Sequence, residues 1–127
     1  MTFLADTNIF LEILLSQPAR SRCEQFLQSH AGDVAISDFS LHSIGVIAFR
    51  RQQAALFKDF LNDSLPNLAL LQLDRAGYPA VARANLDHGL DFDDAYQFTL
   101  AKAHGLTLVT QDRHFERVRS ELAVQFL

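Results

Sequence analysis

Leu90-Asp91-Phe92-Asp93-Asp94-Ala95 opens the segment that decides the fold of this chain, and the segment ends at Leu106-Thr107-Leu108-Val109-Thr110-Gln111-Asp112. Three carboxylates fall within four residues, where a helical pattern begins, and a fourth follows an apolar run of strand character. Crowded carboxylates repel one another, which raises their pKa values and destabilises the ionised set. Because a bound cation would remove that cost, the segment predicts an acidic pocket that holds a divalent metal ion.

Apolar strands and amphipathic helices alternate on both sides of this segment. Short apolar runs predict strands at residues 3–5, 34–36, 68–73, 106–109 and 123–127. Helical spacing predicts helices at residues 9–14, 20–30, 39–48, 52–63, 75–88, 93–104 and 112–121. Continuous apolar runs suit a parallel sheet that is buried on both faces. We therefore expect an α/β protein, a three-layer α/β/α sandwich with a central, mainly parallel sheet, in a single domain of residues 1–127.

The composition is that of a domain with a substantial apolar core. The chain has 127 residues, 49% of them hydrophobic, and its 11 phenylalanines with no tryptophan predict a Phe-rich core. No run approaches the ~18 uncharged apolar residues that span a bilayer, and residues 1–6 lack the basic start of a signal peptide. Cys23 is the single cysteine, so we expect no internal disulfide and a core position for it. These features predict a cytoplasmic protein without a membrane partner.

The net charge of −4 indicates no strong overall attraction to nucleic acid. Acids gathered in a pocket lower this total, however, while a separate rim can stay positive. Two groups of cations fit such a rim: Arg50 with Arg51, and the cluster after Asp112 that comprises Arg113, His114, Arg117 and Arg119. Each group taken alone is more simply explained as a solvated helix face.

The acids are expected to converge at one edge of the sheet. In an open parallel sheet, sites form beyond the carboxyl ends of the strands, where the strand order reverses. Asp6 and Asp112 directly follow the first and fourth strands, and Asp94 lies in the first turn of the helix before the fourth strand. Oxygen ligands of this kind suit Mg²⁺ or Mn²⁺, and zinc fits poorly without nearby cysteines or paired histidines. The implied chemistry is hydrolysis of a phosphate ester by an activated water.

Helix capping is a second explanation for the same residues. Asp6, Asp93 and Asp112 stand where helices are predicted to begin, and aspartate is a favoured N-cap worth ~1 kcal/mol. Any one of them, taken singly, is more simply a cap than a metal ligand. Their co-location at one end of the predicted sheet favours a double role, because the same carboxylate can serve both purposes.

Three segments, in order, resemble the PIN domain, and in particular the VapC-like ribonuclease toxins of bacterial toxin–antitoxin pairs. The segment Leu4-Ala5-Asp6-Thr7-Asn8-Ile9-Phe10 resembles the family's opening strand, and Asp91-Phe92-Asp93-Asp94-Ala95 resembles its central acidic motif. The run from Leu106 to Phe115 resembles its closing strand and acidic turn. The resemblance implies a metal-dependent endoribonuclease that uses Mg²⁺ or Mn²⁺ and takes RNA as its substrate. It also implies a homodimer and a cognate antitoxin protein that covers the site.

The resemblance carries over to particular residues. Asp6, Asp94 and Asp112 match the positions of the metal ligands and are therefore the expected catalytic residues. Asn8 and Thr110 are candidate donors that hold those ligands. Asp91 and Asp93 flank the main ligand, where either one adds an oxygen or faces solvent.

One position departs from the family pattern. The family usually carries a glutamate on the helix after the second strand, and the matching residue here is Ser43. Serine can hydrogen-bond water but brings no charge. Asp38 is a candidate substitute, and His42 is either a phosphate-positioning residue or, more simply, a surface histidine. The loss of one acid predicts weaker metal binding without requiring loss of activity.

Two other functions stay open at this point. A catalytically weak or inactive PIN-like module, which binds RNA or a protein, would also explain Ser43 in place of glutamate. A phospho-receiver domain has similar length and clustered acids, with Asp74 as the candidate phosphoacceptor. Receivers need a lysine after the last full strand, whereas Lys58 and Lys102 both fall in predicted helices, which argues against this hypothesis.

Overall fold

The structure is a computed structural model that describes residues 1–127. A five-stranded sheet of order β3-β2-β1-β4-β5 lies at its centre, and every strand pair is parallel. The strands are β1 (Phe3–Ala5), β2 (Val34–Ser37), β3 (Ala69–Leu71), β4 (Thr107–Thr110) and β5 (Val124–Phe126). The strand order reverses between β1 and β4, which makes their carboxyl ends the expected place for a site.

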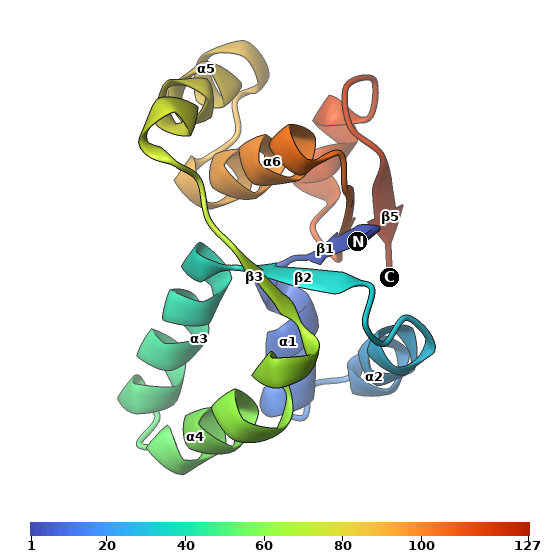
Figure 1. Cartoon of the computed structure of the whole chain (residues 1–127), viewed down its shortest axis with the longest axis vertical. Helices are drawn as coiled ribbons and strands as arrows, with labels where there is room; N and C mark the ends of the chain where they lie inside the picture. The colour runs from blue at the N-terminus through green and yellow to red at the C-terminus, as the bar shows by residue number, and fades with distance from the viewer.

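Helices cover both faces of the sheet, as Figure 1 shows. One face carries α1 (Thr7–Leu14), α2 (Arg20–Ser29), α3 (Asp38–Arg50) and α4 (Ala54–Asp63). The other carries α5 (Tyr78–His88), α6 (Phe92–His104) and the 3₁₀ helix η3 (Arg113–Val118). Two further 3₁₀ turns, η1 (Leu65–Asn67) and η2 (Arg75–Gly77), lie in the connections. The predicted α/β/α sandwich is confirmed, and its sheet is entirely parallel.

The core consists of two apolar clusters, one on each face of the sheet. Leu4 and Leu108 pack toward α5 and α6, whereas the adjacent Ala5 and Val109 pack toward α1 to α4. Successive side chains of a strand point to opposite faces, so a sheet covered on both sides needs apolar residues at every position. This requirement explains the continuous apolar runs of the sequence. Cys23 is fully buried in the second cluster, as predicted.

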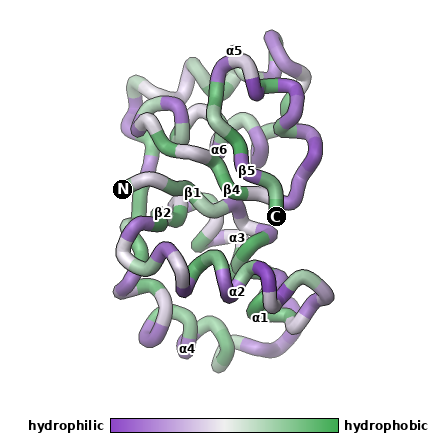
Figure 2. Tube along the Cα trace, turned by 90° about the vertical axis from the view of Figure 1, so that its right-hand side faces the viewer, coloured by the Kyte–Doolittle hydropathy of each residue, from purple (hydrophilic) through white to green (hydrophobic).

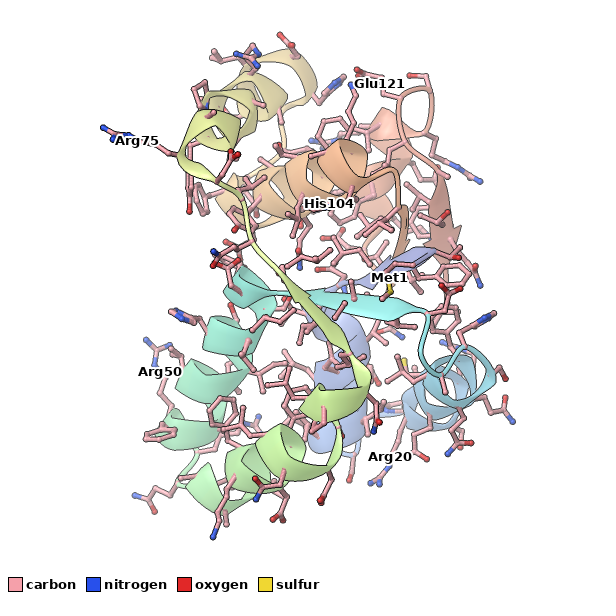
Figure 3. The ribbon with its side chains drawn as sticks, in the orientation of Figure 1. Met1, Arg20, Arg50, Arg75, His104 and Glu121 are labelled. Atoms are coloured by element: carbon pink, nitrogen blue, oxygen red, sulfur yellow. The ribbon has the colours of Figure 1, made fainter.

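Hydrophobic and hydrophilic stretches alternate along the helices in Figure 2, as expected of helices that bury one face. The labelled Arg20, Arg50 and Arg75 lie at the outer edge of the molecule in Figure 3. None of the helices has the length and apolar character that crossing a membrane requires.

Several predicted boundaries were wrong, each for a local reason. α6 begins at Phe92 because Asp91, and not Asp93, is its N-cap: the Asp91 backbone is extended and its side chain accepts a hydrogen bond from the Asp94 N–H. The helix predicted from residue 52 begins at Ala54, since Gln52 has a positive φ of 56° that interrupts the helical backbone. The helix predicted at residues 112–121 is the shorter 3₁₀ helix η3, and the third strand shrinks from residues 68–73 to Ala69–Leu71.

Candidate metal site

The pairing of β1 with β4 brings two of the predicted acids to one edge of the sheet. Ala5 is in register with Val109, and the Asp6 N–H donates to the Val109 carbonyl at 2.8 Å. Asp6 therefore stands directly beyond β1, and Asp112 follows β4 two residues beyond its end. Both lie at the reversal of strand order, which is where the sequence predicted a site.

Asp6 is buried, with 6% of its surface exposed, and its carboxylate is held by four hydrogen bonds. The Thr7 N–H and Gln97 Nε2 donate to Oδ1 at 2.8 and 3.2 Å. Thr110 Oγ1 and Asn8 Nδ2 donate to Oδ2 at 2.7 and 3.2 Å. Burial raises the pKa of Asp6, and these hydrogen bonds oppose that rise because they favour the charged form. The carboxylate is fixed in position before any ligand arrives.

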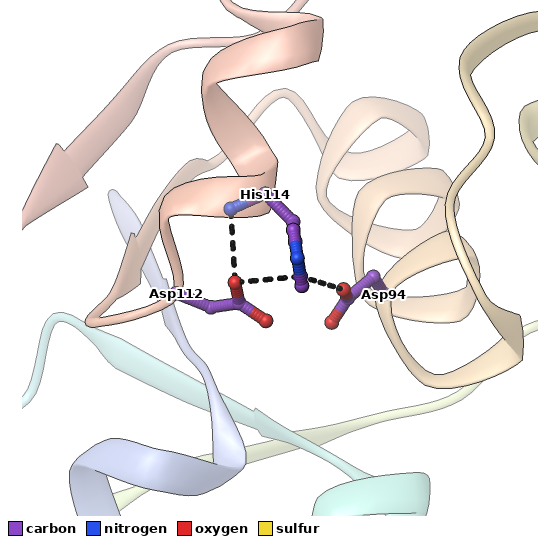
Figure 4. Close-up of side chains that lie close together, drawn as sticks. All are labelled: Asp94, Asp112 and His114. Carbon is purple, nitrogen blue, oxygen red and sulfur yellow. Dashed lines mark hydrogen bonds and ion pairs between the residues drawn. The ribbon is translucent and has the colours of Figure 1, made fainter.

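Asp94, Asp112 and His114 form a second part of the site, drawn in Figure 4. Asp94 is buried in the first turn of α6, and Asp112 caps η3 by accepting the His114 N–H at 2.9 Å. His114 Nδ1 lies 3.0 Å from Asp112 Oδ1 and 3.8 Å from Asp94 Oδ2. One ligand atom from each residue falls within 4.8 Å of the other two, so this cluster can hold a metal ion.

The crowding of carboxylates has the electrostatic effect that the sequence predicted. Burial, followed by the charges of Asp112, Asp91 and Asp6 in that order, raises the pKa of Asp94 to about 7. The metal-free protein therefore binds a proton at Asp94 more readily than an ordinary aspartate does. A divalent cation would displace that proton and stabilise the ionised carboxylate.

Asn8 and Thr110 connect Asp6 to the loop that carries Asp112. Asn8 Nδ2 donates to Thr110 Oγ1 at 3.3 Å, and Asn8 Oδ1 accepts the Gln111 N–H at 3.2 Å. Thr110 Oγ1 in turn accepts the Asp112 N–H at 2.9 Å. The structure thus places both residues beside the acids, in positions suited to the donor role that the resemblance implies.

Asp38, Asp91 and Asp93 lie apart from the cluster of ligand atoms. Asp38 Oδ1 accepts hydrogen bonds from the Phe39 N–H and the Tyr96 hydroxyl, the latter at 2.6 Å. Burial and this contact with Asp38 raise the pKa of Tyr96. Asp91 serves as the cap of α6, and Asp93 is exposed. The structure does not bring Asp38 into the place of a fourth acid, because its carboxylate is turned toward Tyr96.

Ser43 is half-buried on α3 and carries no charge into the site. It lines a pocket of about 510 Å³ between α3 and the first turns of α6. His42 and Arg50 line the same pocket, with His42 exposed as a surface residue. The position that matches the family glutamate therefore lies on the side of α3 that faces the first turns of α6, the helix that carries Asp94.

Gln97 is a site residue that the sequence did not reveal. Its side chain is 1% exposed, and its Nε2 donates both to Asp6 Oδ1 and to Ser40 Oγ, the latter at 2.6 Å. Ser40 Oγ also lies 2.7 Å from Thr7 Oγ1. The sequence feature that could have indicated Gln97 is its position: it is a polar residue one turn after Asp94 in a mostly apolar stretch of the predicted helix. His114 could have been identified in the same way, since it lies only two residues after Asp112 in the sequence.

We expect Gln97→Leu to destabilise the metal-free protein by about 1–2 kcal/mol, because it removes two buried hydrogen bonds, to Asp6 and to Ser40. Urea unfolding measures the change. Gln25→Leu on the exposed side of α2 is the matched control, with an expected change within ~0.5 kcal/mol. An equal free energy of unfolding for both variants would show that Gln97 does not secure Asp6.

A parallel sheet with carboxylates where its strand order reverses defines a class of α/β proteins with an acidic site. Comparison with known proteins identifies the family within this class. Residues 3–121 match the family model of the PIN domain. The chain belongs to the PIN domain family. A comparison with curated proteins gave no match.

Solved structures share the fold over nearly the whole chain. A chain of FitAcB from Neisseria gonorrhoeae is 26% identical, with a TM-score of 0.79 and coverage of 97% of this chain and 96% of that one. A chain of VapBC2 from Rickettsia felis, bound to a promoter DNA fragment, is 18% identical, with a TM-score of 0.83 and coverage of 100% and 99%. A chain of DNA-bound VapBC from Salmonella typhimurium is 17% identical, with a TM-score of 0.82 and coverage of 99% and 98%.

Proposed function

We propose that this PIN domain protein is a metal-dependent endoribonuclease and the VapC-like toxin of a toxin–antitoxin pair. The observation that carries the proposal is the crowding of Asp94 and Asp112 beside the buried Asp6, at the reversal point of a parallel sheet. Like charges held this close destabilise the metal-free protein, so a cation is the simplest reason for their arrangement. Nuclease chemistry on RNA is the activity that best fits such a site in this family.

The donor set fits Mg²⁺ or Mn²⁺, which take oxygen ligands from one or two carboxylates and complete their coordination with water. Asp6, Asp94 and Asp112 are the proposed ligands and catalytic residues. When bound, a divalent ion supplies positive charge that polarises a phosphodiester and lowers the pKa of an attacking water. Water would then be the nucleophile, so no side chain needs to attack the phosphate. All the proposed ligands belong to a single domain.

The chain's own residues orient this chemistry. The hydrogen bonds from Thr7, Asn8, Gln97 and Thr110 hold the Asp6 carboxylate in one orientation. Asp94 lies in the first turn of α6, where the partial positive charge of the helix terminus favours an anion. Oriented carboxylates need no rearrangement as charge develops during the reaction, which lowers its barrier.

Cations next to the site are proposed to bind the RNA backbone. The Arg113 and Arg119 guanidinium groups lie 4.3 and 5.6 Å from the centre of the Phe126 ring. Phe126 is in register with Thr110, so its ring lies at the same edge of the sheet as Asp112, and a strand whose phosphate reaches the carboxylates would pass near both arginines. Arginines stacked on an aromatic ring suit phosphates and unpaired bases alike.

An antitoxin is the proposed protein partner, and a homodimer the proposed assembly in the cytoplasm. The proteins of the same fold from Rickettsia felis and Salmonella typhimurium are VapBC2 and VapBC, which supports a cognate antitoxin for this chain. Val46 and Phe49 on α3 and Leu56 on α4 are large apolar side chains that stay exposed. An exposed apolar surface of this kind fits a partner protein.

Cleavage of a mixed RNA pool by the purified protein tests the proposal. We expect cutting in Mn²⁺ or Mg²⁺ and none in excess EDTA, because the carboxylates alone cannot activate water. Intact RNA in saturating Mn²⁺, with protein that is folded and free of antitoxin, would contradict it.

A non-catalytic binding module is the second candidate function, and the uncharged Ser43 favours it. The candidate substitute Asp38 does not take the place of the missing acid, since its carboxylate accepts a hydrogen bond from the Tyr96 hydroxyl. Wild-type protein that binds RNA in saturating Mn²⁺ without cutting it would support this alternative.

We expect Ser43→Glu to bind Mg²⁺ roughly tenfold more tightly than wild type, because affinity for a divalent ion rises with the number of carboxylates. Titration calorimetry measures this affinity. Ser21→Glu, which adds the same charge on the exposed side of α2, should leave it unchanged. Equal affinities for Ser43→Glu and wild type would show that position 43 does not face the metal site.

A further inference from the structure

His114 is the one nitrogen donor in the cluster of possible metal ligands, beside Asp94 and Asp112. Its backbone and its ring are both engaged by Asp112, which accepts the His114 N–H at 2.9 Å and lies 3.0 Å from Nδ1. The ring lies between the two carboxylates in Figure 4, with Nδ1 also 3.8 Å from Asp94 Oδ2. The turn that carries Asp112 therefore places the His114 imidazole next to the Asp112 carboxylate.

These separations fit a shared ion. Two ligands that bind one ion at about 2.1 Å and at right angles lie about 3 Å apart. The separation of 3.0 Å between Nδ1 and Asp112 Oδ1 matches that value. The separation of 3.8 Å between Nδ1 and Asp94 Oδ2 is wider, but it is shorter than the distance of about 4.2 Å between ligands on opposite sides of an ion. All three ligand atoms fall within 4.8 Å of one another. The His114 side chain is 62% exposed, so it can turn toward an ion without disturbing the core.

The chemistry of imidazole predicts which ions such a site favours. Mg²⁺ is a hard cation that takes oxygen ligands and retains its waters, so it gains little from a nitrogen donor. Divalent transition metals accept imidazole, and their affinity for a given site rises from Mn²⁺ to Co²⁺. A ligand set of carboxylates alone would discriminate less between Mg²⁺ and these ions.

We propose that His114 is a nitrogen ligand of the metal site and makes the site select Mn²⁺ and Co²⁺ over Mg²⁺. The inference rests on the proposed function and deepens it, because it assigns a ligand and an ion preference to the same site. His114 thereby acts as the residue that determines metal specificity.

Titration of the metal-free protein with MnCl₂, CoCl₂ and MgCl₂ tests the inference without RNA. We expect His114→Ala to weaken Mn²⁺ and Co²⁺ binding by about 10- to 100-fold, while the Mg²⁺ affinity changes by less than about threefold. His104→Ala, an exposed histidine at the far end of α6, is the matched control and should leave all three affinities unchanged. Equal weakening of all three ions by His114→Ala, or no weakening, would overturn the assignment.

Electron paramagnetic resonance of the bound Mn²⁺ gives a second readout. We expect hyperfine coupling to a histidine nitrogen in the wild type and its absence in His114→Ala. Wild-type Mn²⁺ without nitrogen coupling would overturn the inference, and the proposed function would survive if that protein still cut RNA. Failure of the wild type to bind any of the three ions would overturn both.

Discussion

Asp94→Asn is expected to lower metal-dependent RNA cleavage by at least about 100-fold while the fold survives, because it removes charge from the centre of the site. Burial, followed by the charges of the surrounding carboxylates, raises the pKa of Asp94, so this carboxyl group interacts with the other acids of the site. The substituted amide keeps nearly the same shape in the buried first turn of α6. Initial rates on a fixed RNA substrate in Mn²⁺ measure the loss, and circular dichroism verifies the fold.

Asp93→Asn is the matched control for this experiment. It removes a carboxylate from the adjacent residue in the same helical turn, but Asp93 is exposed and outside the ligand cluster. We expect its cleavage rate to stay within about threefold of wild type, in the manner of a surface substitution. Wild-type activity in Asp94→Asn, or an equal loss in both variants, would refute the assignment of Asp94.

The same substitution should stabilise the protein when metal is absent. The pKa of Asp94 rises from its ordinary value of 3.8 to about 7 on folding, so between these values the folded state binds the proton more tightly than the unfolded state. Stability from this group is therefore fully present below about pH 4 and is lost as the pH rises through about 7. At about pH 8, Asp94→Asn should be more stable than wild type by roughly 2 kcal/mol, allowing for partial solvent screening of the carboxylate.

Urea unfolding in EDTA at about pH 8 and about pH 4 measures this difference. Asp59→Asn on the exposed side of α4 is the control and should not stabilise the protein at either pH. Saturating Mn²⁺ should reverse the order at about pH 8, because an ion that binds only the folded state stabilises it by mass action. A variant no more stable than wild type in EDTA would contradict the claim that crowding strains the metal-free site.

The placement of Asp6 and Asp112 beyond neighbouring strands was predictable because it follows from topology alone, whereas the cluster of possible metal ligands joins Asp94 and Asp112 with His114 and does not include Asp6. Apolar runs located β1 and β4, and the reversal of strand order in a parallel sheet then placed Asp6 and Asp112 at one edge. Asp94 followed from its place in the first turn of the preceding helix. None of these steps required knowledge of a side-chain rotamer.

What the sequence missed depends on local backbone angles and on tertiary contacts. The cap of α6 is Asp91 rather than Asp93, a shift of two residues that the extended backbone of Asp91 decides. The role of Gln97 arises only when α6 packs beside β1, which brings its amide to Asp6. Asp38 could not be excluded as a fourth acid until its contact with the Tyr96 hydroxyl was visible.

Anomalous X-ray scattering from a crystal grown in MnCl₂ would test the central claim most directly, since it locates the ion without relying on activity. We expect a strong anomalous peak between the carboxylates of Asp94 and Asp112, at the edge of the sheet where Asp6 follows β1. A crystal with manganese bound elsewhere and none at these carboxylates would contradict the account.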